Sequence, residues 1–145
     1  MPSVRDVLAS KGSQVLSISP DATVLDAVNL MNAHKVGALV VMDGDEVVGM
    51  FTERDVLQRV VGAAKPAAGT LVSDVMTSDV ICCQPAADLD DVAATMKHRR
   101  IRHLPVCNGD GRLQGMISMG DVNAYNASNQ EAHLHYLSEY IYGRV

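Results

Sequence analysis

The chain carries one sequence unit twice, at an offset of 65 residues that becomes 66 after a single insertion in the second copy. The aligned segments are residues 19–28 with 84–93, 39–41 with 104–106, and 49–56 with 115–122. One copy of about 60 residues is too small to bury both faces of a sheet by itself. Units of this kind bury their apolar faces against each other. The repeat therefore limits the fold to two similar units that pack together.

Each copy has the pattern of a β-α-β-β-α unit. Thr23 and Asp88 are suitable N-caps, and each precedes a segment whose apolar residues recur at helical spacing. A second helix is predicted to begin after Thr52 and after Ser118. The predicted strands are residues 15–19, 36–42 and 46–51 in the first copy, and 80–84, 102–107 and 113–118 in the second. The predicted fold class is α/β (α+β), with the two repeats packed sheet to sheet around a pseudo-two-fold axis.

The repeat also divides the chain. The expected parts are a first repeat over residues 1–61, a linker over 62–71, a second repeat over 72–125 and a C-terminal amphipathic helix over 126–145. In the tail, Leu134, Leu137 and Ile141 are spaced as on one face of a helix. This helix is predicted either to cover the module's own core or to pack on a partner subunit.

The charge and hydropathy of the chain exclude several classes of protein. The chain has 12 Lys and Arg residues and 17 Asp and Glu residues, and the resulting formal net charge of −5 disfavours a nucleic-acid-binding role. A hydrophobic fraction of 48% excludes a disordered chain. No apolar run approaches the roughly 20 residues that span a bilayer. We expect a protein that binds neither nucleic acid nor a membrane.

The first residues and the cysteines bear on the cellular compartment. Residues 1–6 lack the charged start and apolar block of a signal peptide, which favours a cytoplasmic location. Cys82 and Cys83 are adjacent, so on a strand they point to opposite faces and are poor partners for each other. Together with Cys107 they are predicted to be packing thiols in a reducing compartment.

One repeated motif carries chemistry. It is Gly-x-x-Thr/Ser-x-x-Asp, at Gly49, Thr52 and Asp55 and again at Gly115, Ser118 and Asp121. Taken singly, each hydroxyl and carboxylate form an ordinary helix capping box. The same junction of strand and helix offers free N–H groups and a hydroxyl to a phosphate, and the carboxylate can accept hydrogen bonds from a ribose diol. Its recurrence at matching places in a doubled unit favours a nucleoside-phosphate site.

Jointly, these features resemble a tandem pair of cystathionine-β-synthase (CBS) domains, a Bateman module, over about residues 4–125. The segments that carry the resemblance are residues 24–31, 36–41, 49–55, 75–77, 100–106 and 115–121. The resemblance implies a regulatory sensor that binds adenine nucleotides (AMP, ADP or ATP, in some members NAD or S-adenosylmethionine) in the clefts between repeats. It implies that Thr52, Asp55, Ser118 and Asp121 meet ribose and phosphate. It also implies that Thr77 and the start of the next strand near Val80 border the adenosine, whereas the first copy has residues 9–11 at that place.

A basic run follows the first helix of the second copy. Residues 97–103 include Arg100, Arg102 and His103, whereas the counterpart segment, residues 32–38, is nearly neutral. One or two cations are enough to compensate the dipole at a helix C-terminus, and the basic run has more. We therefore expect one strong site that uses Ser118, Asp121 and the basic run. A weaker or differently filled site is expected around Thr52 and Asp55, where Arg54 either assists or is merely solvated.

The functional expectation is a regulatory module and not an enzyme. No Ser-His-Asp pattern, metal-ligand spacing or Walker A lysine is present. Modules of the resembled family usually regulate an attached enzyme or transporter, and the chain leaves no residues for one. We expect a stand-alone homodimer that binds an adenine nucleotide and signals to a separate partner protein. The alternative is a structural protein–protein interaction module whose clefts hold no nucleotide.

Overall fold

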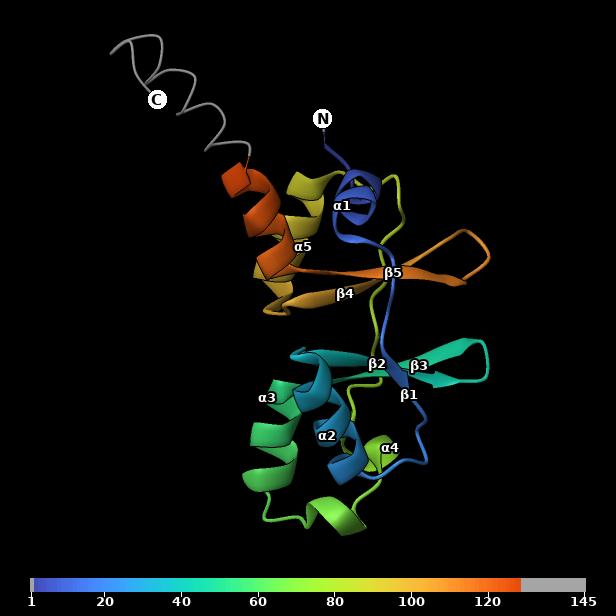
Figure 1. Cartoon of the computed structure of the whole chain (residues 1–145), viewed down its shortest axis with the longest axis vertical. Coiled ribbons are helices and arrows are strands. Elements are labelled where there is room, and N and C mark those ends of the chain that lie inside the picture. Colours follow the sequence, from blue (N-terminus) through green and yellow to red (C-terminus); the bar gives the residue numbers. More distant parts are fainter. Residues whose placement is uncertain (1, 129–145) are drawn as a thin grey trace, which may run out of the picture.

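The computed structural model describes residues 2–128, and Figure 1 shows two α/β halves stacked with their sheets facing each other. The first half contains β1 (Ser17–Ile18), α2 (Val24–His34), β2 (Ala38–Asp43), β3 (Glu46–Thr52), α3 (Glu53–Asp55) and the continuing π-helix η1 (Val56–Val61). A connection follows with the short η2 (Ala67–Gly69) and α4 (Val72–Val75). The second half contains α5 (Leu89–Arg99), β4 (His103–Cys107), β5 (Leu113–Ser118) and a helix that is described as far as residue 128. Preceding them all is α1 (Val4–Lys11). The predicted fold class is confirmed.

The predicted strand at residues 80–84 is wrong, and the one at 15–19 is shorter than expected. Strand β1 pairs parallel with β2, and β2 and β4 pair antiparallel with β3 and β5 respectively. In the second half, a single parallel bridge between Cys83 and Val106 takes the place of a third strand. The reason lies in one substitution between the copies. The Val40 N–H donates to the carbonyl of Leu16 at 3.2 Å, but its counterpart Pro105 has no N–H to donate.

The helix caps follow the sequence pattern in the first half more closely than in the second. The Thr23 hydroxyl accepts the Asp26 N–H at 3.1 Å, and the Asp26 carboxylate accepts the Thr23 N–H at 3.4 Å. In the second half the Asp88 carboxylate accepts the N–H of Asp90 at 2.9 Å. The cap of the second half therefore spans two residues, whereas that of the first half spans three.

Each half is completed by a helix that belongs to the other half in sequence. On α1, Val4 and Val7 are buried in the core formed by α5, β4 and β5, and the Val4 N–H donates to the carbonyl of Ala87 at 2.9 Å. On α4, Val72 and Val75 are buried in the core of the first half. The sequence repeat and the spatial half are therefore different units. Figure 1 shows α1 beside α5 and α4 beside α2.

A third, smaller core lies between the two sheets. Ala38, Val40 and Met50 are its buried members, and Val80 and Met116 are among the residues that pack against them. The expected sheet-to-sheet packing is present, but each half also has a larger apolar core of its own between sheet and helices. The tail residues Leu134, Leu137 and Ile141 lie outside the described part of the chain. Within residues 2–128, no helix combines the length and apolar character that crossing a bilayer requires.

Candidate functional site

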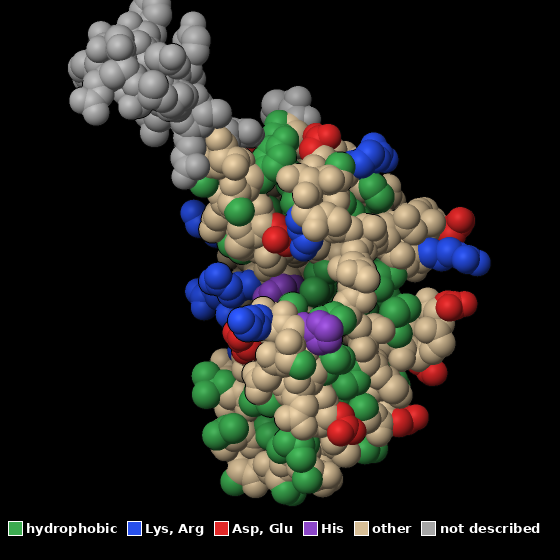
Figure 2. Space-filling model, viewed as in Figure 1, with side chains coloured by type: hydrophobic (Ala, Val, Ile, Leu, Met, Phe, Trp, Pro, Cys, Tyr) green, Lys and Arg blue, Asp and Glu red, His purple; other side chains and the backbone are tan. Residues whose placement is uncertain are grey.

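A cavity of about 530 Å³ opens between the two halves. Among the residues that line it are Thr52, Glu53, Arg54, Asp55 and Arg59 from the first half, Thr77, Asp79, Val80 and Ile81 from the connecting segment, and Arg99, Ile101, Arg102, His103 and Pro105 from the second half. Figure 2 shows Lys and Arg side chains gathered at one edge of the molecule where the halves meet, with His side chains beside them. The cavity thus combines residues from three parts of the chain.

The junction of β3 and α3 supplies the polar floor of the cavity. The Thr52 N–H donates to Asp55 Oδ2 at 3.0 Å, and the Asp55 N–H donates back to the Thr52 hydroxyl at 3.4 Å. The capping box is therefore real. The Asp55 carboxylate does more than cap the helix, because its second oxygen, Oδ1, accepts the Thr77 hydroxyl at 3.1 Å. Arg59 Nε lies 3.7 Å from the same oxygen. Asp55 is only 4% exposed, and these partners satisfy its buried oxygens.

The segment after α4 forms one wall. Thr77 and Met50 exchange two backbone hydrogen bonds of 2.9 Å, which fixes this segment against the edge of β3. The close approach requires a glycine at Gly49, because a Cβ there would lie 2.6 Å from Met76 Sδ and 3.0 Å from the carbonyl oxygen of Thr77. Val80 and Ile81 follow along the same wall. The structure thus places Thr77 and Val80 beside Thr52 and Asp55.

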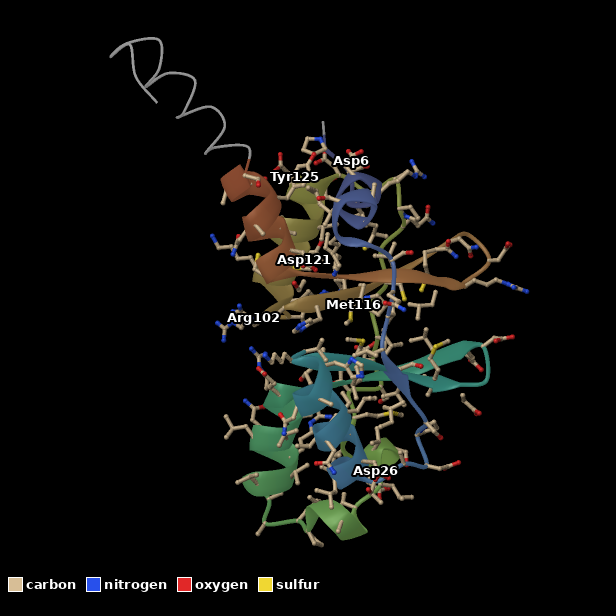
Figure 3. The ribbon with its side chains drawn as sticks, in the orientation of Figure 1. Asp6, Asp26, Arg102, Met116, Asp121 and Tyr125 are labelled. Carbon is tan, nitrogen blue, oxygen red and sulfur yellow. The ribbon has the colours of Figure 1, made fainter. Side chains whose placement is uncertain are left out.

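Four arginines line the cavity, and two of them were not singled out from the sequence. Arg99 belongs to the basic run, and Arg59 follows Asp55 by four residues, a spacing that predicts a contact on one helix face. Arg59 also donates to the carbonyl of Met76 at 2.8 Å. By contrast, Arg100 does not line the cavity: it is the left-handed C-cap of α5, with φ of 56°. Figure 3 shows Arg102 at the level of the gap between the two sheets.

His103 lies on β4 where the cavity meets the second half. Burial lowers the pKa of its imidazole from the ordinary value, and the neighbouring Arg102 guanidinium lowers it further. The carboxylates of Glu53 and Asp121 act in the opposite direction without reversing the shift. At neutral pH the imidazole is therefore neutral and can donate one hydrogen bond and accept another.

The second copy of the motif has a different neighbourhood. The Ser118 N–H donates to Asp121 Oδ2 at 2.9 Å, which reproduces the capping box of the first copy. Neither Ser118 nor Asp121 lines the cavity, although the basic run does. The cavity groups Arg99, Arg102 and His103 with Thr52 and Asp55 of the other repeat. Ser118 and Asp121 lie outside this cavity but close to His103, which pairs with Ser118 between β4 and β5 and lies near the Asp121 carboxylate.

The sequence matches the CBS domain model over residues 4–62 and 72–127. The chain belongs to the CBS-domain family. The CBS domain-containing protein YhcV of Bacillus subtilis is 33% identical over 132 residues, which make up 91% of this chain and 91% of YhcV. The structure of the CBS-domain containing protein ATU1752 from Agrobacterium tumefaciens is similar, with a TM-score of 0.82 and 39% identity over 86% of this chain and 99% of that one. The repeat, the two facing sheets and the shared cleft are thus those of a CBS pair.

A more distant CBS pair shares the fold. The CBS domain pair of protein MJ0100, solved in complex with 5′-methylthioadenosine and S-adenosyl-L-methionine, gives a TM-score of 0.79 at 20% identity, over 89% of this chain and 98% of that one. At that identity the likeness concerns the fold and not the site. Within residues 2–128 of this CBS pair, no cluster of three or more His, Cys, Asp or Glu residues is arranged to hold a metal ion.

Proposed function

We propose that this CBS pair binds an adenine nucleotide in the cavity between its halves and acts as a regulatory module. The observation that carries the proposal is the meeting, in one cavity, of the Thr52–Asp55 junction with Arg99, Arg102 and His103 of the opposite half. A volume of about 530 Å³ lies within the roughly 300–1,000 Å³ typical of small-molecule sites. Its lining combines apolar, hydrogen-bonding and cationic groups, as a nucleotide requires.

The apolar lining suits a purine base. Met50, Val80, Ile81, Ile101 and Pro105 offer flat or branched apolar surface without a charge. The neighbouring Asp55 carboxylate suits the ribose, because a sugar hydroxyl could replace the Thr77 hydroxyl at Oδ1, which exchanges one neutral donor for another of the same chemistry. The base and ribose would therefore lie along the wall formed by the connecting segment.

The cations suit a phosphate of modest charge. Four arginines line the cavity, against the three carboxylates of Glu53, Asp55 and Asp79, and His103 is neutral at neutral pH. This small positive excess matches a monophosphate better than a triphosphate. We therefore expect AMP to bind at least as tightly as ATP, with NAD as a further candidate whose AMP moiety meets the same groups.

Binding would act on a separate protein by changing how the halves sit against each other. The cavity is lined from both halves, so a ligand that contacts both favours one arrangement over others by its differential affinity. A CBS pair of the same fold, that of MJ0100, holds adenosine compounds, which supports the capacity of the fold for such ligands. The regulated partner would bind more tightly or more weakly to the outer surface changed in this way.

Calorimetric titration with AMP, ATP, NAD and adenosine tests the proposal. Arg99→Gln combined with Arg102→Gln should weaken AMP by about tenfold or more while leaving adenosine within twofold, because only the phosphate meets these cations. Arg112→Gln is the matched control, since Arg112 is exposed on the turn between β4 and β5. Absence of binding by any of the four ligands to the folded protein would reject nucleotide sensing. It would favour the alternative of an interaction module, which the exposed Leu57 and Val61 support independently.

A further inference from the structure

The second copy of the motif is in contact with a lysine from the far end of the chain. Lys11 Nζ lies 2.6 Å from Asp121 Oδ2 and donates to the carbonyl oxygen of Met116 at 2.8 Å. Both side chains of the ion pair are partly buried, at 35% and 26% exposure. Figure 3 shows Met116 and Asp121 on β5 and the helix that follows it, near the end of α1.

Comparison of the halves shows what the ammonium replaces. In the first half, Thr77 supplies two donors to the motif: its N–H donates to the Met50 carbonyl at 2.9 Å and its hydroxyl donates to Asp55 at 3.1 Å. The repeat aligns Met50 with Met116 and Asp55 with Asp121. The single ammonium of Lys11 thus contacts the carbonyl and the carboxylate that are equivalent to those contacted by Thr77, although it meets the carboxylate at Oδ2 and Thr77 meets it at Oδ1.

The lengths of α1 and α4 explain the difference. Leu8 fills the space in front of Gly115, as Met76 fills the space in front of Gly49, so Leu8 and Met76 are equivalent. Helix α4 has four residues and ends before Met76, which lets Thr77 turn into an extended bridge with Met50. Helix α1 has eight residues and continues past Leu8 as far as Lys11. Because α1 is longer than α4, it places the Lys11 ammonium at the second motif, where the first motif has the extended backbone of Thr77.

We propose that Lys11 is a built-in occupant of the second nucleotide position, so that each chain binds nucleotide in the first cleft alone. This inference rests on the proposed function and adds its stoichiometry. A ribose diol that engaged Asp121 at Oδ2 would have to displace a charge-assisted hydrogen bond and leave the Met116 carbonyl without its ammonium donor. The counterparts of Arg99 and Arg102 in the repeat are His34 and Gly37, so the second position also offers less charge to a phosphate.

The pKa of Asp121 is consistent with this contact. Burial alone would raise the pKa of its carboxyl, but the hydrogen bonds from Lys11 and from the Ser118 N–H together hold it below the ordinary value. His103 lies near the pair, but its imidazole is neutral at neutral pH. The carboxylate is therefore ionised and paired before any ligand arrives.

Stoichiometry by calorimetry with AMP is the decisive measurement. The wild-type chain should bind one AMP, and Lys11→Met should bind a second with an affinity at least tenfold weaker than the first. Arg99→Gln with Arg102→Gln should weaken the first event in both backgrounds and leave the second event of the Lys11→Met chain unchanged. Lys65→Met is the matched control, because Lys65 is exposed in the linker, and it should keep one site.

Three outcomes overturn the proposal. Two AMP molecules bound by the wild-type chain would show that Lys11 does not occupy the position. Loss of an AMP site in Lys11→Met would show that Lys11 is a phosphate ligand instead. If neither chain binds AMP, the proposed function fails by itself, and carbon NMR titration of the Asp121 carboxyl then decides about Lys11: its pKa should rise in Lys11→Met but not in Lys65→Met. An unchanged titration would mean that Lys11 does not hold the carboxylate.

Discussion

The guanidinium of Arg54 donates a hydrogen bond of 2.7 Å to the carbonyl oxygen of Arg100, so that the start of α3 is tied to the end of α5. The two residues are 46 positions apart and belong to opposite halves. The contact involves the backbone of Arg100, whose side chain is not among those that line the cavity. The tie sets the distance between the halves beside the proposed phosphate position.

Removal of the hydrogen bond between Arg54 and the Arg100 carbonyl should lower the affinity of the site for AMP. Arg54→Ala is expected to weaken AMP binding about fivefold to tenfold, because it removes one cavity cation and one hydrogen bond between the halves. Arg100→Gly should keep wild-type affinity, since the carbonyl remains and the left-handed φ of 56° suits glycine. Calorimetric titration of the two variants compares them directly. Equal losses in both would mean that the Arg100 side chain binds the ligand.

The Thr77 hydroxyl should contribute to stability before any ligand binds. Thr77→Val removes the donor to the buried Asp55 carboxylate and is expected to lower the free energy of unfolding by about 1–2 kcal/mol. Thr95→Val is the control, because the Thr95 hydroxyl bonds only to the carbonyl of Asp91 on α5. Urea denaturation of both variants gives the difference. A Thr77→Val protein as stable as the Thr95→Val protein would contradict the role given to this contact.

His103 should make both stability and AMP affinity depend on pH. Because its pKa is lowered in the folded protein, the unfolded chain binds a proton first, and stability should fall as the pH drops below the ordinary histidine value. A bound phosphate favours the imidazolium, so AMP binding should take up protons and tighten as the pH falls. His103→Asn should remove this uptake, while the phosphate's own titration remains in both proteins. Calorimetry in two buffers of different ionisation enthalpy measures it, and equal uptake by both proteins would contradict the assignment.

The three cysteines should differ in reactivity despite their proximity. Burial raises the pKa of the Cys83 thiol to about 11 and, with a hydrogen bond to Cys82, that of Cys107 to about 12. Cys82 is exposed, with its sulfur 3.2 Å from that of Cys107. Because the thiolate is the nucleophile, brief treatment with iodoacetamide at pH 8 should label Cys82 first. Peptide mass spectrometry reads the order. Equal labelling of all three in the folded protein would be incompatible with these environments.

Dimer formation should depend on η1. Leu57 and Val61 are 66% and 67% exposed and lie four residues apart on this helix, whereas Val60 is buried, with 2% exposure. Sedimentation should give about twice the chain mass of 15.5 kDa. Leu57→Lys with Val61→Lys should give the monomer, and Leu25→Lys, on α2 with 43% exposure, should not. A wild-type monomer at micromolar concentration, or a dimer in the double variant, would remove the proposed interface.

The fold could be predicted from the sequence to a large extent, because the repeat and its helical spacing are local signals. The hairpin strands, the cap at Thr23 and the helix after Thr52 all follow from them. The missing third strand of the second half depends on Pro105, which has no N–H to donate, and this effect appears only once the pairing is known.

The site was harder to predict, because its contacts cross between halves. Its hydroxyls and carboxylates are visible in the repeated motif, but the partners of each depend on how the sheets face each other. Arg102 and Asp55 line one cavity although they belong to different repeats. The contact between Lys11 and Asp121 spans 110 residues, and nothing near either position in the sequence indicates it.

The exchange of α1 and α4 between the halves also affects the order in which the protein is completed during synthesis. The first half receives its last buried residues, Val72 and Val75, soon after residue 61 and can close early. Helix α1 leaves the ribosome first, but Val4 and Val7 have no complete apolar site until α5, β4 and β5 have followed. The N-terminal helix α1 is therefore synthesised first but packs into its core last, and the core of the second half is complete only when α1 has packed against it.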